Sequence, residues 1–214
     1  MTIRIELADD HSILRQGLRR ILECHSHFQI VAEASSGLEA VQMADAHHPD
    51  VAVVDIGMKE LNGIEATAQI LRRSPETAVL ILSMYGDERY VIRAMNAGAR
   101  GYLLKDSVEE DLVRGIEQVH EGKSFFSPAV SKILSDSYAR GRSKDVDDRY
   151  ALLTERERQI YQLLAEGNSN KEVAGRLGVS LHTVETHRTR IMEKLGVHNA
   201  AELVLSAVRR GLIC

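Results

Sequence analysis

The first 121 residues of this 214-residue chain alternate between short apolar runs and amphipathic stretches, and this alternation strongly limits the possible folds. Each apolar run has the length of a strand, and each following stretch carries apolar residues at helical spacing. Parallel strands need helical crossovers, so the pattern predicts an α/β fold, a doubly wound five-stranded parallel sheet with helices on both faces. The predicted strands lie near 3–8, 28–34, 51–54, 78–82 and 99–104, and the predicted helices near 12–24, 37–47, 63–72, 87–97 and 107–120.

The strand signal disappears after residue 150, where only short helical patterns remain. Two capping boxes, Thr154–Glu157 and Ser169–Glu172, mark helix starts in this region. Four helices are predicted near 154–166, 169–176, 180–195 and 199–210. A tight turn containing Gly178 joins the second and third, which is the outline of a helix-turn-helix in a small all-α domain.

Between these regions the chain changes character. Ser127-Pro128 is a typical helix start, because proline fits the first helical position, whereas residues 139–145 are small and polar. We therefore predict a domain at 1–121, a linker at 122–149 that is partly helical at its front and flexible near 140–149, and a second domain at 150–214.

The net charge of −4 is unevenly distributed along the chain. Residues 1–121 carry −8, residues 122–150 carry +2 and residues 151–214 carry +2, which suggests two domains with different partners. No apolar run reaches about 18 residues, so no membrane span is expected. The two cysteines, Cys24 and Cys214, form no metal-ligand pattern, and the N-terminus lacks a signal-peptide pattern. These features predict a cytoplasmic protein.

Reactive side chains follow several of the predicted strands directly. Asp9 and Asp10 follow the first strand, Asp55 the third, Ser83 the fourth and Lys105 the fifth. The carboxyl ends of parallel strands share one edge of a sheet, so these groups are expected to meet there. Clustered carboxylates repel unless a cation is present, and Mg²⁺ favours oxygen ligands.

This constellation suits phosphoryl transfer. Asp55 would carry a phosphoryl group as an acyl phosphate, Lys105 would pair with a phosphate oxygen, and Ser83 would offer a hydroxyl. Each residue alone has a plainer reading as a turn, capping, core or surface residue; the combination in this order favours a site.

At these positions the first 121 residues resemble the receiver domain of bacterial response regulators. The segments Leu82-Ser83-Met84 and Gly101–Asp106 are similar to the NarL/FixJ subfamily. The resemblance implies that Asp55 takes a phosphoryl group from a sensor histidine kinase. It further implies the following roles: Mg²⁺ binding by Asp10, Asp55 and the Gly57 carbonyl with help from Asp9, phosphate binding by Ser83 and Lys105, and an inward rotation of Tyr102 behind Ser83.

One residue departs from the receiver pattern. Lys59 follows Met58 where that family usually has proline. The substitution leaves the shape of this loop open and adds a cation near the site.

The third C-terminal helix is predicted to present one apolar and one polar face. Val184, Ile191 and Leu195 should pack on the other helices of the domain. The packing partners predicted for them are Leu164, Val173, Ala174 and Leu177. The polar face carries His182, Glu185, Thr186, Thr189 and Arg190. Such a face on the second helix of the motif favours insertion into the DNA major groove.

Residues 150–214 resemble the LuxR-type DNA-binding domain. The matching segments are Leu153–Glu157, Glu166–Ala174 and Thr183–Arg188. The resemblance implies base contacts from Glu185, Thr186 and Thr189, and a dimer surface on the helix from Asn199 to Arg210. The candidate DNA-binding residues are Lys171, Thr183, Glu185, Thr186, His187, Arg188, Thr189, Arg190 and Lys194, with His187 equally acceptable as a packing residue.

Three functions remain to be compared. The first is a phosphorylation-switched transcription factor that binds double-stranded DNA as a homodimer and needs Mg²⁺. The second is a DNA-binding protein whose first domain is a constitutive interaction module, for which Lys59 is the only sequence support. The third, a small-molecule phosphatase resembling haloacid dehalogenases, needs a second aspartate two residues after the nucleophile, where this chain has Gly57. We therefore predict that the chain is not an enzyme.

Overall fold

The structure, a computed structural model, describes residues 2–139, 149–210 and 212–213. The segment predicted to be flexible, near 140–149, lies outside these ranges except for its last residue. The chain divides into two compact units, Met1–Arg142 and Ser143–Cys214, and each is described by itself.

The first unit alternates strands and helices, as the hydrophobic periodicity predicts. Its elements are β1 (Ile3–Ala8), α1 (Ser12–Glu23), β2 (Phe28–Ala34), α2 (Gly37–His47), β3 (Val51–Asp55), α3 (Gly63–Arg73), β4 (Ala78–Ser83), α4 (Glu88–Asn96), β5 (Gly101–Leu104), η1 (Lys105–Ser107), α5 (Val108–His120), β6 (Phe125–Phe126) and α6 (Pro128–Ala139).

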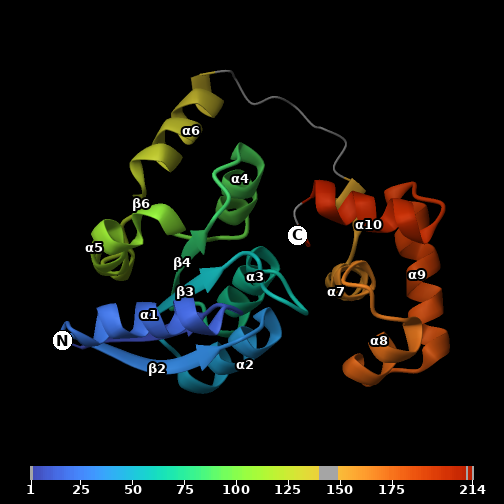
Figure 1. The fold of residues 1–214 in the computed structure, drawn as a ribbon, viewed down its shortest axis with the longest axis horizontal. Coiled ribbons are helices and arrows are strands. Elements are labelled where there is room, and N and C mark those ends of the chain that lie inside the picture. The colour runs from blue at the N-terminus through green and yellow to red at the C-terminus, as the bar shows by residue number, and fades with distance from the viewer. Residues whose placement is uncertain (1, 140–148, 211, 214) are drawn as a thin grey trace. The chain divides into compact units, whose positions relative to one another are not determined.

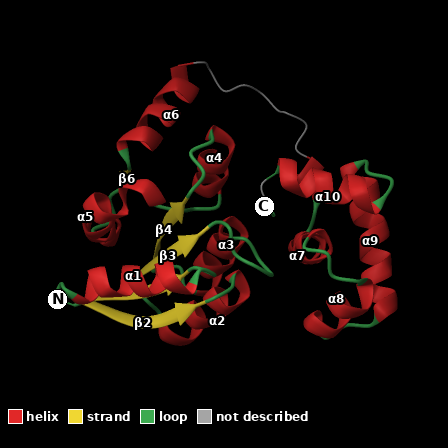
Figure 2. Ribbon diagram, in the orientation of Figure 1, coloured by secondary structure: helices red, strands yellow, loops and turns green. Residues whose placement is uncertain are grey.

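The strands form one sheet with the order β2-β1-β3-β4-β5-β6, and every neighbouring pair is parallel. The strands are coloured yellow in Figure 2. The chain starts at β1, moves outward to β2, and then returns past β1 to β3. This reversal lies between β1 and β3, where an open parallel sheet typically places its ligand site. The predicted fold class is therefore confirmed.

The predicted number of strands is wrong, because the sheet has six strands instead of five. The additional strand, β6, contains only Phe125 and Phe126, which pair with Gly101 and Tyr102 of β5. Two residues are too few to produce a recognisable alternation, so the sequence pattern did not reveal it. The strand lies in the segment that was expected to begin the linker, and α6 follows it directly.

Helices cover both faces of the sheet (Figure 1). One apolar core lies beneath α1 and α5, and the other lies beneath α2, α3 and α4. Val130 of α6 is fully buried in this second core, together with Val91 and Ala94 of α4 and Tyr102 of β5. The linker-side helix therefore belongs to the packing of the first unit.

The second unit is helical in its described residues. It contains η2 (Arg149–Leu152), α7 (Glu155–Ala165), α8 (Asn170–Leu177), α9 (Leu181–Leu195) and α10 (Ala200–Arg209). The predicted capping boxes at Thr154 and Ser169 are both present. Gly178 ends α8 with a φ of 63°, a left-handed conformation that glycine adopts without a steric cost.

The predicted apolar face of α9 is confirmed. Val184, Ile191 and Leu195 are buried and share one core. Their predicted neighbours Leu164, Val173, Ala174 and Leu177 belong to the same core. Among the described helices of the whole chain, none is both long and apolar enough to cross a membrane.

Candidate functional site

Three carboxylates and an imidazole gather at the carboxyl edge of the sheet. Asp9 and Asp10 follow β1, and Asp55 ends the neighbouring strand β3. Asp9, Asp10, His11 and Asp55 each offer a ligand atom within 4.8 Å of the others. Asp9 and Asp55 are almost completely buried, at 1% and 4% exposure, so their charges are poorly screened by water.

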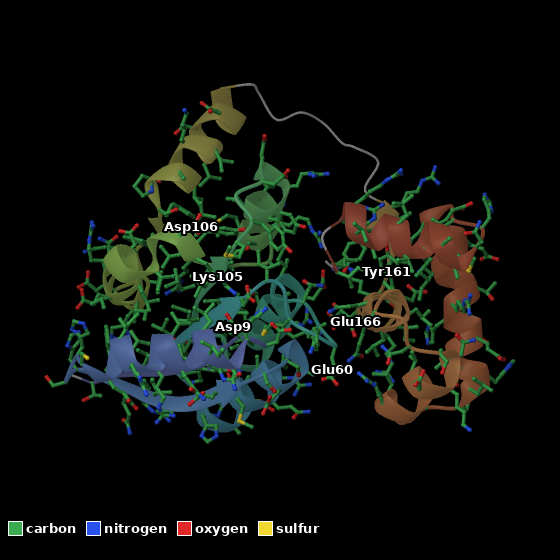
Figure 3. All side chains as sticks on the ribbon, in the orientation of Figure 1. Asp9, Glu60, Lys105, Asp106, Tyr161 and Glu166 are labelled. Carbon is green, nitrogen blue, oxygen red and sulfur yellow. The ribbon has the colours of Figure 1, made fainter. Side chains whose placement is uncertain are left out.

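Lys105 forms ion pairs with two of these carboxylates. Figure 3 labels Lys105 and one of its partners, Asp9. The Lys105 Nζ atom is 2.9 Å from Asp9 Oδ2 and 2.9 Å from Asp55 Oδ2. Burial and the nearby Asp9 raise the pKa of Asp55, and they outweigh the opposing attraction of Lys105. Burial alone would lower the pKa of Lys105, but the two carboxylates raise it overall. The ammonium therefore remains charged within the cluster.

The donor set fits a hard divalent cation such as Mg²⁺. Carboxylate oxygens from Asp9, Asp10 and Asp55 are the ligand type that this ion favours, and they converge within coordination reach of one another. Gly57 lies beside them, and its backbone N–H donates to the Asp55 carboxylate.

His11 is a member of this cluster that the sequence analysis missed. Its Nδ1 atom lies 2.8 Å from Asp10 Oδ1 and 3.3 Å from Asp9 Oδ1, although its side chain is 69% exposed. The available signal was its position directly after Asp9-Asp10, before the first turn of α1.

Ser83 and Tyr102 lie on the next two strands, β4 and β5. The Ser83 hydroxyl is fully buried and accepts a hydrogen bond of 3.0 Å from the Tyr85 backbone N–H. Tyr102 is also fully buried, and its hydroxyl donates to the Tyr85 carbonyl oxygen at 2.6 Å. Burial raises the pKa of Tyr102, although a hydrogen bond with Ser83 opposes the shift. Tyr102 therefore already occupies an inward position that is linked to Ser83.

The loop between β3 and α3, which contains Lys59, is held by its backbone. The Lys59 carbonyl oxygen accepts from the N–H groups of Leu61 at 2.7 Å and Gly37 at 3.3 Å, while its side chain is exposed. A Cβ atom on Gly37 would lie 1.8 Å from the Leu61 carbonyl oxygen, and one on Gly63 would lie 1.9 Å from that of Asp55. Both glycines are required because backbone segments approach them too closely for a side chain.

The polar face of α9 carries most of the candidate DNA-binding residues. Glu185, Thr189 and Arg190 are exposed, and Thr183, Thr186, His187 and Arg188 are partly exposed. The hydroxyls of Thr186 and Thr189 donate to carbonyl oxygens one turn earlier, at 2.9 and 3.1 Å. Lys171 is exposed in the first turn of α8, and Asn170 beside it accepts from Arg188 at 3.3 Å.

Two candidate DNA-binding residues on α9, Lys194 and His187, have side-chain atoms that are paired or buried within the second unit. Lys194 Nζ lies 2.6 Å from Glu157 Oε2 of α7, so its charge already has a partner within the unit. The Nδ1 atom of His187 is buried and has no hydrogen-bond partner among the described residues.

Each of the two units matches a known protein family. Residues 5–117 match the family described as response regulator receiver domain, and residues 151–207 match the luxR family of bacterial regulatory proteins. The oxygen regulatory protein NreC of Staphylococcus carnosus is 36% identical over 99% of both chains.

Solved structures of similar proteins agree with these family matches. The response regulator ChrA of a heme-sensing two-component system is 36% identical, with a TM-score of 0.54 over 99% of both chains. A structure of RcsB dimers bound to DNA is 25% identical, with a TM-score of 0.60 over 97% of this chain and 100% of that one.

Proposed function

Because the chain belongs to the family of two-component response regulators that join a receiver domain to a LuxR-type DNA-binding domain, we propose that phosphorylation of Asp55 controls its binding to DNA. Members of this family are transcription regulators and not enzymes. The observation that carries the proposal is the contact of Lys105 Nζ with the buried carboxylates of Asp9 and Asp55, 2.9 Å from each.

The proposed reaction transfers a phosphoryl group from a histidine of the sensor kinase. An Asp55 oxygen forms the new P–O bond while the P–N bond breaks, and the departing imidazole keeps that electron pair. Asp9, Asp10 and Asp55, with the Gly57 carbonyl, would hold Mg²⁺. When bound, this ion neutralises charge on the carboxylates and on the phosphoryl oxygens.

Lys105 and Ser83 are proposed to bind the transferred group. Lys105 lies beside the Asp55 carboxylate, so its ammonium can pair with a phosphoryl oxygen after only a small movement. Ser83 ends the adjacent strand β4 and can donate its hydroxyl to the same group. Ser83 has a single hydroxyl proton, so donating it to the phosphoryl group would compete with its hydrogen bond to Tyr102. Tyr102 is bonded to the Tyr85 carbonyl oxygen, so phosphorylation is expected to disturb the loop after β4.

Labelling with acetyl phosphate tests the phosphoacceptor. With Mg²⁺ present, wild type is expected to gain one phosphoryl group by intact mass, and Asp55→Ala is expected to gain none because it lacks the nucleophile. Asp45→Asn, on the exposed surface of α2, is the matched control and should be labelled like wild type. Undiminished labelling of Asp55→Ala would place the phosphoacceptor elsewhere.

We propose that the second unit binds double-stranded DNA by inserting α9 into the major groove. Glu185, Thr186 and Thr189 are proposed to contact base edges: glutamate accepts from cytosine N4, and threonine offers a methyl group to thymine. The phosphate contacts are proposed to come from Lys171, Thr183, His187, Arg188 and Arg190. Lys194 is a weaker candidate, because a move toward DNA would leave Glu157 buried without its cation.

Two substitutions separate base contacts from phosphate contacts. Glu185→Ala is expected to relax the preference at one base position, whereas Lys171→Ala should weaken all sequences alike and reduce the salt slope by about 1. Binding titrations with a set of single-base operator variants at several salt concentrations measure both effects. A uniform loss from Glu185→Ala would contradict its role in base recognition.

We also propose that α10 contacts a second copy of the chain. Val204, Leu205 and Val208 are exposed on this helix, at 36%, 48% and 47%. RcsB, a relative, binds DNA as a dimer.

Phosphorylation of Asp55 is expected to strengthen the binding of the chain to its operator. Equal operator affinity with and without phosphorylation, measured at matched salt, would instead favour a constitutive interaction role for the receiver domain.

A further inference from the structure

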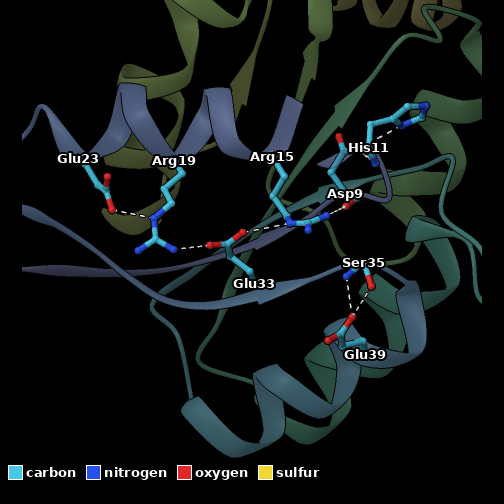
Figure 4. A network of polar contacts seen from close by, with 8 residues as sticks. All are labelled: Asp9, His11, Arg15, Arg19, Glu23, Glu33, Ser35 and Glu39. Atoms are coloured by element: carbon cyan, nitrogen blue, oxygen red, sulfur yellow. Dashed lines mark hydrogen bonds and ion pairs between the residues drawn. The ribbon is translucent and has the colours of Figure 1, made fainter. Parts of the chain in front are cut away.

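A chain of ion pairs on α1 and β2 ends at the backbone of Asp9 (Figure 4). Arg15, in the first turns of α1, donates from Nη1 to the Asp9 carbonyl oxygen at 2.5 Å. The same guanidinium donates from Nε to Glu33 Oε2 on β2 at 3.0 Å. Glu33 in turn contacts Arg19, whose Nε atom lies 2.7 Å from Glu23 Oε1.

The turn after β1, which carries Asp9 and Asp10, is held by several hydrogen bonds, and Arg15 supplies one of them. At this point the chain has left β1, and the Asp9 N–H is held by the Ala34 carbonyl oxygen at 3.1 Å. The Asp9 Oδ1 atom accepts from the His11 N–H at 2.7 Å. The Asp9 carbonyl oxygen is held by Arg15, so the N–H, the carbonyl group and the side chain of Asp9 are all constrained.

The geometry of the guanidinium makes this contact directional. Arginine presents its donors in a rigid planar fork, so Arg15 can bridge the Asp9 carbonyl oxygen and Glu33 at the same time. Its side chain is only 18% exposed, which limits competition from water. The charge of Glu33 offsets that of Arg15, so the main effect on the acidic cluster is one of position.

We propose that Arg15 is a positioning residue for the Mg²⁺ and phosphoryl site. It acts through Asp9, and Glu33 holds it from the edge strand β2. This inference rests on the proposed function, because it assigns a role in the site where Asp55 would be phosphorylated. The residue fixes the direction in which Asp9 and Asp10 leave β1, so its removal should loosen the cation site without removing a ligand.

Calorimetric titration of the full chain with Mg²⁺ tests the role independently of phosphorylation. Arg15→Met is expected to weaken Mg²⁺ binding about tenfold, the size of effect typical of residues that orient metal ligands. Arg15→Lys should not restore the affinity, because an ammonium keeps the charge but lacks the planar fork. Arg19→Met is the control: it removes an arginine from the same chain of ion pairs but leaves both contacts of Arg15, and should stay within about twofold of wild type.

Labelling with acetyl phosphate gives a second readout. The Mg²⁺ concentration for half-maximal labelling of Arg15→Met should rise by the same factor, while the rate at saturating Mg²⁺ stays close to that of wild type. General destabilisation would not produce this separation. If circular dichroism shows that Arg15→Met does not fold, Arg15→Lys and Glu33→Gln carry the test, and both are expected to bind Mg²⁺ more weakly.

Four outcomes would overturn the proposal. They are wild-type affinity in a folded Arg15→Met, full rescue by lysine, an equal loss in Arg19→Met, and a wild-type chain that does not bind Mg²⁺. A wild-type chain that binds Mg²⁺ but is never labelled would contradict the proposed phosphorylation instead, and the measured Mg²⁺ affinities would still decide the role of Arg15.

Discussion

At pH 9 the Glu6→Met variant is expected to melt about 10 °C above wild type, and at pH 5 this advantage should fall to the smaller one that comes from removing a neutral, unpartnered carboxyl group. Glu6 lies in β1, is fully buried, and neither of its carboxylate oxygens has a hydrogen-bond partner among the described residues. Burial, with a smaller contribution from Glu39 of α2, raises its pKa from 4.5 to about 8. Methionine has a similar length and carries no charge.

The sign of the effect follows from proton binding. Between pH 4.5 and about 8 the folded chain holds a proton on Glu6 that the unfolded chain has released, so stability falls as the pH rises through this range. The accumulated cost in the folded state is on the order of 5 kcal/mol above pH 8, since one pKa unit corresponds to about 1.4 kcal/mol.

Scanning calorimetry of the full chain between pH 5 and pH 9 measures this difference. The Glu6→Gln variant separates the effect of charge from the effect of polarity. It should remove the pH dependence of stability that Glu6 causes, but its melting temperature should rise less than that of Glu6→Met, because a buried amide without a partner remains costly. A Glu6→Met variant that keeps the wild-type slope would show that other groups, such as the histidines, produce the pH dependence.

The second large effect is expected at the contact between α7 and α9. Lys194→Met should destabilise the second unit by about 3 kcal/mol at pH 7, because it leaves the carboxylate of Glu157 without its cation. Glu157 is only 3% exposed and also accepts from the Thr154 N–H at 2.8 Å. Burial would raise the pKa of Glu157, but the hydrogen bonds from Lys194 and Thr154 outweigh it, so the pKa is lowered.

A lowered carboxyl pKa gives a defined pH window. The stabilisation from Lys194 is fully present above the unfolded pKa of about 4.5 and is lost as the pH falls through the lower folded value. Hydrogen exchange of α7 and α9 peptides in the full chain should therefore show a deficit for Lys194→Met at pH 7 that shrinks at low pH.

The double variant Glu157→Gln/Lys194→Met is the matched control. It should recover much of the lost stability, because it removes the unpaired charge as well. If Lys194→Met instead keeps wild-type protection and lowers the salt slope of DNA binding by about 1, then Lys194 is a phosphate contact, as the sequence suggested.

Much of the fold could be predicted because hydrophobic periodicity is a property of the sequence itself. The apolar runs located β1 to β5. The rule that the carboxyl ends of parallel strands share one edge placed Asp9, Asp55 and Lys105 together from the sequence alone. The contacts in the structure agree with that grouping. The helix-turn-helix was equally visible, since capping residues and glycine stops mark its helices.

The remaining features depend on three-dimensional contacts that no local pattern encodes. β6 is too short to alternate, and it exists because its two residues pair with β5. The Arg15 guanidinium that contacts the Asp9 carbonyl oxygen is also bound by Glu33 of β2, which lies 18 residues further along the chain. The ion pair of Lys194 could not be predicted from a local pattern, because its partner Glu157 lies 37 residues earlier in the chain.

The short strand β6 also determines where this protein can be divided. A fragment that stops at residue 121 would remove the two residues that pair with β5. The carbonyl oxygens of Arg100 and Tyr102, which accept from the N–H groups of Phe125 and Ser127, would then lie on an open edge with which strands of other molecules could pair. Such a fragment would also remove Val130, which fills part of the core beside Tyr102. Gene fusions and exchanges of regulatory modules should therefore keep the chain intact through α6, because the piece that can be transplanted ends after that helix.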